Sequence, residues 1–230
     1  MGEHWLVIDT ASRTGRVGLV RDGVVAGSAQ LDAARRHARD LTPAVAGLLD
    51  AAGLKMANLT GVVVSVGPGS YTGLRVGITA AKALSYALGC ALVPVPTFAA
   101  IANRAAAADL WVIADALQGQ VYLQRYRGAE AVDALRIASA AEVLPAAPAE
   151  AWFSGPGVAA FAALLAGRPV VPEGDREPTV ESLFAASRSI APLTRAEMFA
   201  LEPLYLRGSS AEEAAKKKAE SVSPPPSGAS

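Results

Sequence analysis

The 230-residue chain has a single cysteine, Cys90, and only two histidines, His4 and His37. One cysteine excludes an intramolecular disulfide and any zinc site built from several cysteines. The two histidines are too far apart in sequence to form the His-x-x-x-His pair that places two imidazoles on one helix face. The composition therefore offers no recognisable metal site, and none is expected.

The chain also lacks an excess of charge and long apolar runs. Its 21 basic and 21 acidic residues cancel, so no strong positive field draws it toward nucleic acid. No apolar run approaches the ~20 residues that a membrane-spanning helix requires. The N-terminus has no basic segment of the kind that begins a secretory signal peptide. We expect a cytoplasmic protein that contacts no membrane and meets nucleic acid only through partners.

The chain opens with a strand and a hairpin, and the same pattern returns near its middle. Residues 5–9 are an apolar run that ends in Asp9, followed by a hairpin with an Asp-Gly turn. Residues 110–115 are a second apolar run that ends in Asp115, again followed by a turn and a strand. We interpret the recurrence as an internal duplication. It predicts the α/β, actin-like ATPase (ASKHA) fold, with two duplicated lobes that each contain a mixed sheet flanked by helices.

The predicted lobes cover residues 1–107 and 108–208. A charged tail rich in proline and serine follows over residues 209–230, and its composition predicts disorder. Within the second lobe the expected elements are strands over residues 152–154 and 169–171 and helices over residues 158–165 and 180–188.

Helix and strand patterns are clearest in the first lobe. Residues 41–52 carry apolar side chains at helical spacing, with Thr42 as the expected cap and Pro43 in the first turn. Residues 62–66 are mostly β-branched without interruption, which is typical of a parallel strand buried on both faces. A second helix is expected over residues 72–89.

Between that buried strand and the second helix lies a glycine-rich run over residues 67–77. Such a joint presents backbone N–H groups at a helix N-terminus, which is a general site for anions. A Walker A loop requires lysine after its last glycine, but Leu74 follows Gly73. The spacing also differs from the dinucleotide fingerprint and from the nucleophile elbow.

The energy available from such a joint is small. A helix terminus stabilises an anion by about 0.3 to 1 kcal/mol, and by roughly 2 kcal/mol at best, whereas micromolar binding requires about 8 kcal/mol. The run therefore cannot hold a nucleotide by itself. From the residues alone, it is equally a structural turn in which Gly67 and Gly69 take unusual dihedral angles and Ser70 or Thr72 caps the helix.

The eleven residues of this run resemble the signature G-P-G-S-[FY]-T-G-[LV]-R-[IV]-G of the bacterial TsaB (YeaZ) family. Residues 8–12, 115–122 and 202–207 are also similar to the family, and the resemblance covers residues 4–207. It implies an actin-like fold, dimerisation through the first two helices, and a non-catalytic subunit related to TsaD. Such a subunit would form a heterodimer with TsaD that the ATPase TsaE joins, while TsaD transfers threonylcarbamoyl to adenosine 37 of tRNA.

The resemblance also assigns roles to residues. It implies a partner-facing loop and helix made of Gly67, Pro68, Gly69, Ser70, Tyr71, Thr72, Gly73, Arg75 and Val76. The first helix adds Leu41, Val45 and Leu48 to this interface. Asp9, Ser12 and Asp115 match positions that organise metal and phosphate in active actin-like enzymes, and they are interpreted as remnants of a nucleotide site. No catalytic residue and no tightly bound cofactor are expected, with ATP or ADP only at the interface of the complex.

The chain departs from the family pattern at two positions. Leu117 and Gln120 stand where the family usually has arginine and glutamate, so any role of that ion pair is not carried over. The alternative function is an actin-like ATPase or small-molecule kinase that uses Asp9 and Asp115. A homodimer of the isolated chain remains an alternative assembly, and contact with tRNA is expected only indirectly.

Overall fold

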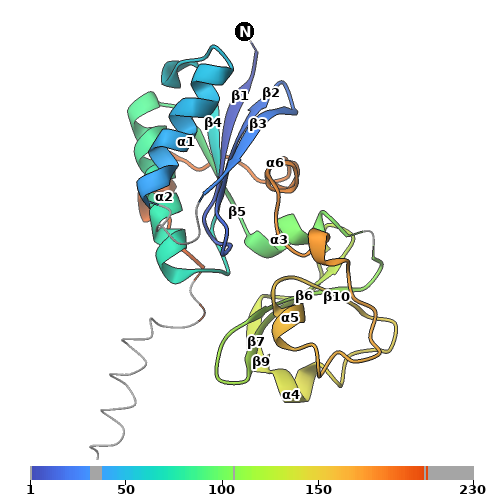
Figure 1. Cartoon of the computed structure of the whole chain (residues 1–230). Coiled ribbons are helices and arrows are strands. Elements are labelled where there is room, and N and C mark those ends of the chain that lie inside the picture. The colour runs from blue at the N-terminus through green and yellow to red at the C-terminus, as the bar shows by residue number, and fades with distance from the viewer. Residues whose placement is uncertain (1, 32–37, 106, 205, 207–230) are drawn as a thin grey trace, which may run out of the picture.

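The first lobe of the computed structural model is built on a five-stranded mixed sheet (Figure 1). The structure describes residues 2–31, 38–105, 107–204 and 206, so His37 and the tail over residues 209–230 lie outside the described residues. The strand order is β3-β2-β1-β4-β5. The strands are β1 (His4–Asp9), β2 (Arg16–Arg21), β3 (Val24–Gln30), β4 (Gly61–Ser65) and β5 (Ala91–Val95).

The pairing of these strands confirms the predicted strand and hairpin. Strand β1 is antiparallel to β2 and parallel to β4. Asp22 and Gly23 in the β2–β3 turn have φ angles of 50° and 85°, as a type I′ hairpin turn requires. The predicted buried strand is β4, in which every residue is buried.

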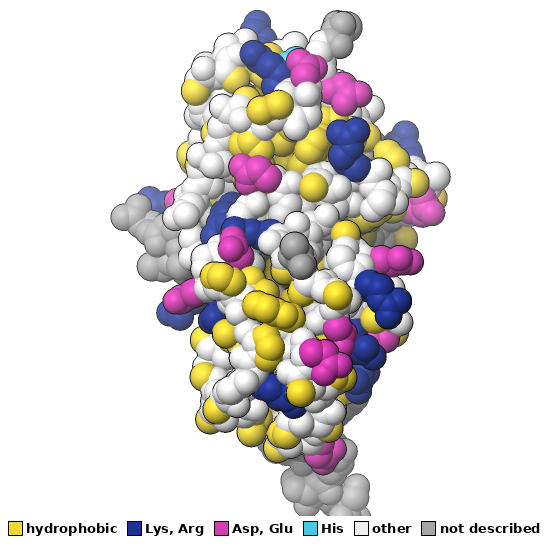
Figure 2. Space-filling view, turned by 90° about the vertical axis from the view of Figure 1, so that its right-hand side faces the viewer, with side chains coloured by type: hydrophobic (Ala, Val, Ile, Leu, Met, Phe, Trp, Pro, Cys, Tyr) yellow, Lys and Arg dark blue, Asp and Glu magenta, His cyan; other side chains and the backbone are white. Residues whose placement is uncertain are grey.

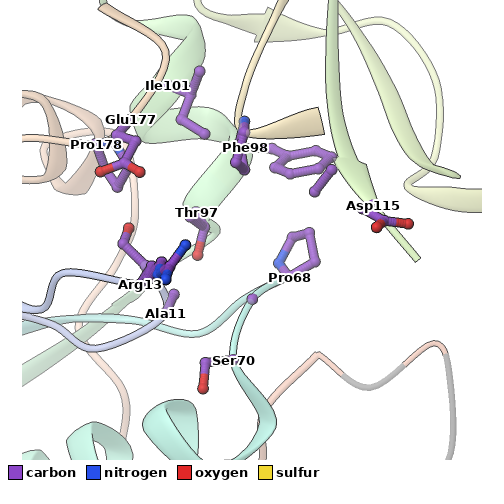
Figure 3. Close-up of a pocket in the computed structure, with 14 residues that line it drawn as sticks. Ala11, Arg13, Pro68, Ser70, Thr97, Phe98, Ile101, Asp115, Glu177 and Pro178 are labelled. Atoms are coloured by element: carbon purple, nitrogen blue, oxygen red, sulfur yellow. The ribbon is translucent and has the colours of Figure 1, made fainter. Parts of the chain in front are cut away.

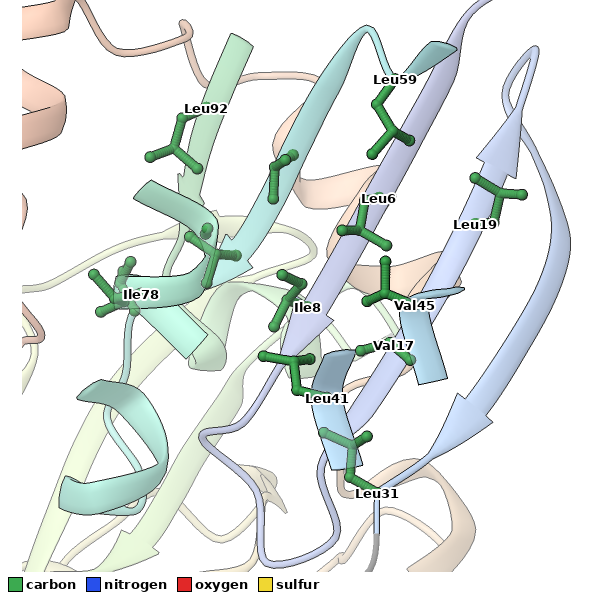
Figure 4. Packing of buried hydrophobic residues seen from close by; sticks show 14 of the residues in the cluster. Leu6, Ile8, Val17, Leu19, Leu31, Leu41, Val45, Leu59, Ile78 and Leu92 are labelled. Atoms are coloured by element: carbon green, nitrogen blue, oxygen red, sulfur yellow. The ribbon is translucent and has the colours of Figure 1, made fainter. Parts of the chain in front are cut away.

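Helices cover both faces of this sheet because side chains alternate along each strand. Leu6 and Ile8 of β1 pack against α1 (Ala38–Ala51) and α2 (Tyr71–Leu88), as Figure 4 shows. Val7 points to the opposite face, where α6 (Val180–Ser187) lies. Because helices lie on both faces of the sheet, β4 does not alternate between apolar and polar side chains.

The first helix begins earlier than its sequence pattern indicates. It starts at Ala38, so Thr42 is not its cap and Pro43 lies inside it. Proline removes one backbone donor from a helix, but Leu41 and Val45, on either side of Pro43, are almost fully buried against the sheet. Burial of this apolar stripe overrides the local signal for a helix start.

The second lobe repeats the arrangement around a smaller sheet with the order β10-β6-β7-β8, in which β9 also pairs with β7. Its strands are β6 (Leu110–Asp115), β7 (Gln120–Arg127), β8 (Glu130–Ala131), β9 (Arg136–Ser139) and β10 (Trp152–Ser154). Helices α4 (Ala140–Val143) and α5 (Gly157–Ala160) cover one face, and α3 (Thr97–Ala102) covers the other.

Two expected elements of this lobe are shorter than predicted. The expected strand over residues 169–171 makes only one bridge, from Val170 to Phe153. The expected helix over residues 158–165 is the four-residue α5, and turns follow it. Alanine gives this segment helical propensity, but such short helices are marginal by themselves, and Val158, Phe161 and Leu165 reach the core from α5 and the turns that follow it.

The two sheets show the predicted duplication. The order β3-β2-β1-β4 in the first sheet corresponds to β9-β7-β6-β10 in the second. In both, the strand that ends in aspartate pairs with an antiparallel hairpin on one side and a parallel strand on the other. This is the actin-like (ASKHA) fold.

The end of the described chain returns to the first lobe. Val180, Leu183 and Phe184 of α6 pack with Val7 and Val63 of the first sheet. The helix α7 (Arg195–Ala200) lies against α2. The predicted second lobe over residues 108–208 includes these residues, but α6 covers a face of the first sheet whose apolar side chains would otherwise be exposed. No helix of the described ranges is long and apolar enough to cross a membrane.

Candidate functional site

The glycine run forms the joint between β4 and α2. Gly67 has a φ angle of 109°, a conformation that side chains disfavour. The Ser70 hydroxyl accepts a hydrogen bond from the Gly73 N–H at 3.2 Å and caps the helix. Of the two predicted caps, Ser70 is therefore the one used, while Thr72 lies exposed in the first turn.

Three glycines of this run pack against the loop that follows β1. A Cβ atom added at Gly69 would lie 2.5 Å from the Ala11 carbonyl oxygen, and one at Gly73 would lie 2.0 Å from the Thr10 carbonyl oxygen. At Gly77 an added Cβ would lie 2.1 Å from the Thr10 hydroxyl. The Ser70 N–H also donates to the Ala11 carbonyl at 2.8 Å. The spacing of the glycines thus serves close packing of α2 on the loop after β1.

Asp9 joins three segments of the first lobe and is only 1% exposed. One carboxylate oxygen accepts from the Ala11 N–H at 3.0 Å and from the Ser65 hydroxyl at 2.7 Å. The other accepts from the Ser12 hydroxyl at 2.8 Å. The carboxylate therefore binds the end of β1, the following loop and the end of β4 to one another.

Replacing Asp9 with alanine is expected to destabilise the protein by about 2 to 4 kcal/mol. The reason is that buried donors at Ala11 and Ser65 lose their acceptor, and each unsatisfied group costs about 1 to 3 kcal/mol. Urea unfolding of the purified variant measures the change. Asp115→Ala is the matched control, since that carboxylate is exposed and should cost under about 1 kcal/mol. Equal losses from both variants would contradict the structural role of Asp9.

A cleft of about 460 Å³ lies between the two lobes (Figure 3). It brings together five of the residues predicted from sequence, which are Ser12, Pro68, Gly69, Ser70 and Asp115. The remaining lining residues are Ala11, Arg13, Thr97, Phe98, Ile101, Ala114, Pro156, Glu177 and Pro178. Asp9 does not line the cleft, and neither do Tyr71, Thr72, Gly73, Arg75 and Val76.

The polar groups of the cleft lie on different walls. Figure 3 shows Arg13 near Ala11 on one side and Asp115 beyond Pro68 on the other. Asp115 is exposed, and one of its oxygens accepts from the Leu117 N–H at 2.7 Å. The two aspartates therefore do not meet at a common site. Among the described residues, no group of three histidine, cysteine, aspartate or glutamate side chains is arranged to hold a metal ion.

A second Gly-Pro-Gly turn, which the sequence reasoning missed, faces the cleft from the second lobe. Gly155, Pro156 and Gly157 follow β10 as the first turn follows β4. Gly155 has a φ angle of 96°, and a Cβ added there would lie 2.3 Å from the Ile113 carbonyl oxygen. The repeated tripeptide was a usable signal, because the duplication predicts a second copy after the matching parallel strand.

The predicted first-helix interface needs a correction. Leu41 and Val45 are 4% and 2% exposed and belong to the core under α1, so they cannot face a partner. Leu48 is half-buried, as is Val76 of α2. Half-buried apolar side chains of α1 and α2, together with Ala52 directly after α1, pack against the same core cluster, and we call this set the α1–α2 seam. Its members are Ala44, Leu48, Ala52, Val76, Ala80, Leu84 and Leu88.

The chain is similar to proteins of tRNA threonylcarbamoyladenosine synthesis. A family model described as "TsaD: tRNA N6-adenosine threonylcarbamoyltransferase" matches residues 28–194. An uncharacterized protein of Mycobacterium tuberculosis is 38% identical over 207 residues, which cover 88% of this chain and 90% of that protein. The Bacillus subtilis tRNA threonylcarbamoyladenosine biosynthesis protein TsaB is 34% identical over 124 residues, covering 53% of this chain and 54% of that protein.

Solved structures agree with this similarity. The structure described as YeaZ from Pseudomonas aeruginosa has a TM-score of 0.74 at 25% identity and covers 89% of this chain and 100% of that one. A second structure, described as an uncharacterized protein with similarity to peptidase YeaZ from Pseudomonas aeruginosa, has a TM-score of 0.75 at 26% identity, with the same coverage of both chains.

Proposed function

Because this chain belongs to the family of TsaD and TsaB (YeaZ) proteins, we propose that it is a non-catalytic partner subunit in the synthesis of threonylcarbamoyladenosine in tRNA. It binds a TsaD-like transferase in the cytoplasm and stabilises the active form of that enzyme. The transferase holds the catalytic groups and contacts the tRNA, so this chain contacts tRNA only indirectly.

The observation that carries the proposal is the use of the glycine run inside the chain. The Ser70 N–H and the space beside Gly69 and Gly73 are taken up by the loop after β1. The oxygens of Asp9 are likewise occupied by donors of the same chain. Groups that an actin-like enzyme would direct at phosphate and metal therefore stabilise the fold instead.

The α1–α2 seam supports the partner role. Its apolar side chains pack against the core but are only half-buried in this chain. Two helices of a partner can therefore complete their burial. Arg75 and Thr72 lie exposed on α2 and would form part of the polar rim of such an interface. We therefore place the TsaD-like partner on this seam and on the start of α2.

The proposal includes a third protein and a nucleotide. A TsaE-like ATPase joins the heterodimer. This chain contacts ATP or ADP only at the interface of the complex. In the absence of the TsaD-like partner, a second copy of this chain is the alternative occupant of the seam.

Depletion of the protein in its own organism tests the proposed function. We expect threonylcarbamoyladenosine in digested tRNA, measured by mass spectrometry, to fall at least tenfold. Expression of the Asp115→Ala variant should restore it, because Asp115 is not needed for catalysis by the partner. An unchanged level of the modified nucleoside after depletion would refute the proposal.

The same experiment distinguishes the proposed function from the rival function of an ATPase or kinase. The cleft, with an exposed carboxylate at Asp115, is the feature that favours that rival. It requires Asp115→Ala to be inactive and the isolated chain to turn over Mg-ATP. Calorimetric titration with Mg-ATP should show no micromolar binding to the isolated chain.

A further inference from the structure

Two stretches of chain cross between the lobes. The first crossing, residues 103–105, directly follows α3, which contacts both α6 of the first lobe and β6 of the second, and the second crossing, residues 172–179, leads from the second lobe back to α6. The second crossing contains a short 3-10 helix, η2 (Glu173–Asp175). In two-lobed proteins the relative motion of the lobes is absorbed at such crossings.

One arginine ties the two crossings to each other. Arg104, directly after α3, donates from Nη1 to the Glu177 carbonyl oxygen at 2.8 Å. Its Nη2 pairs with the carboxylate of Asp175. A single guanidinium on the first crossing thus holds two points of the second.

A second arginine ties the same segment to the first sheet. Arg16, at the start of β2, donates from Nη1 to the Pro178 carbonyl oxygen at 2.7 Å. Its Nη2 lies 3.4 Å from a Glu177 carboxylate oxygen. The second crossing is therefore held on one side by the first crossing and on the other by the sheet.

The arginines at these contacts are more buried than their acidic partners. The side chains of Arg104 and Arg16 are 19% and 23% exposed, and those of Asp175 and Glu177 are 47% and 37% exposed, so solvent screens the two ion pairs in part. Basic and acidic side chains also lie next to one another at the junction of the upper and lower parts of the molecule in Figure 2.

We propose that Arg16 and Arg104, with Asp175 and Glu177, form a clasp that holds the two lobes at one fixed angle. Glu177 and Pro178 line the cleft, so the clasp also fixes the width of the cleft. The lobes of this chain do not close on a ligand, and the molecule presents its surfaces as a rigid body. The inference concerns the chain itself and does not depend on the proposed partner.

Pulsed electron resonance between spin labels on the two lobes tests the clasp. Labels are attached through Asp50→Cys on α1 and Glu142→Cys on α4, both exposed positions, in a Cys90→Ser background that removes the native thiol. We expect one narrow distance distribution for the wild-type clasp, and a distribution at least twice as wide for the Arg16→Ala, Arg104→Ala double variant. Arg125→Ala is the matched control, because its ion pair with Asp109 does not join the crossings.

The Arg104→Lys variant keeps the charge but cannot hold both Glu177 and Asp175, so it should widen the distribution to a smaller extent. This variant also serves if the double variant does not fold. Hydrogen exchange should be at least tenfold faster at residues 172–179 in each clasp variant and unchanged in β1 and β6. A distribution as narrow as wild type in the folded double variant, or in Arg104→Lys if the double variant does not fold, would overturn the clasp.

Discussion

Gly73→Ala is expected to lower the free energy of unfolding by about 3 kcal/mol or more and to leave much of the protein unfolded near body temperature. The added methyl group would lie 2.0 Å from the Thr10 carbonyl oxygen, a backbone atom that cannot rotate away. Overpacking of a core usually costs about 1 to 3 kcal/mol, and a backbone clash at a fixed joint belongs at or above the top of that range.

Gly47→Ala in α1 is the matched control for this experiment. Gly47 is also helical, but it is exposed and an added Cβ would meet nothing within 4 Å. Alanine there should raise stability by about 0.5 to 1 kcal/mol, because glycine is the poorer helix former. Urea unfolding monitored by circular dichroism measures both variants. A Gly73→Ala protein as stable as wild type would show that the glycine spacing does not serve packing.

Leu48→Glu and Val76→Asp are each expected to weaken binding to the TsaD-like partner at least 100-fold, which corresponds to about 2.7 kcal/mol. Both side chains lie in the α1–α2 seam and are half-buried in the isolated chain. A charge placed there loses its hydration when the partner covers the seam, and no opposite charge of the seam compensates it.

Co-purification and titration with the TsaD-like protein of the same organism measure this loss. Val132→Glu is the control, since Val132 is 44% exposed and lies in the second lobe, away from the seam. Melting curves of the free variants establish that they remain folded. Unchanged binding by both seam variants would move the interface elsewhere, while the depletion experiment would still test the function.

Much of the first lobe was predictable because local and tertiary requirements agree there. The β-branched run of β4 and the Asp-Gly turn of the first hairpin each specify one conformation. The second lobe was less predictable, because its alanine-rich segments favour helix while only a short α5 is used. The start of α1 was misplaced for a related reason, since burial of Leu41 outweighs the cap signal of Thr42.

The candidate site was predictable only as a set of residues. The glycine run, Asp9 and Asp115 were all identified from sequence, but their roles depend on which atoms meet. The two aspartates look equivalent in sequence, yet one is 1% exposed with three hydrogen bonds and the other faces solvent at the cleft.

The sequence by itself determined the duplicated α/β architecture and the family, because strand periodicity, turn residues and an eleven-residue signature are local properties. The tertiary structure decided that Gly69, Gly73 and Gly77 receive the loop after β1, that α6 covers the first sheet, and that two arginines join the lobe crossings. These contacts link residues distant in sequence, for instance Arg16 with Pro178. The hydrophobic periodicity of the sequence does not indicate such pairs, because they form only when the sheets and helices have packed together.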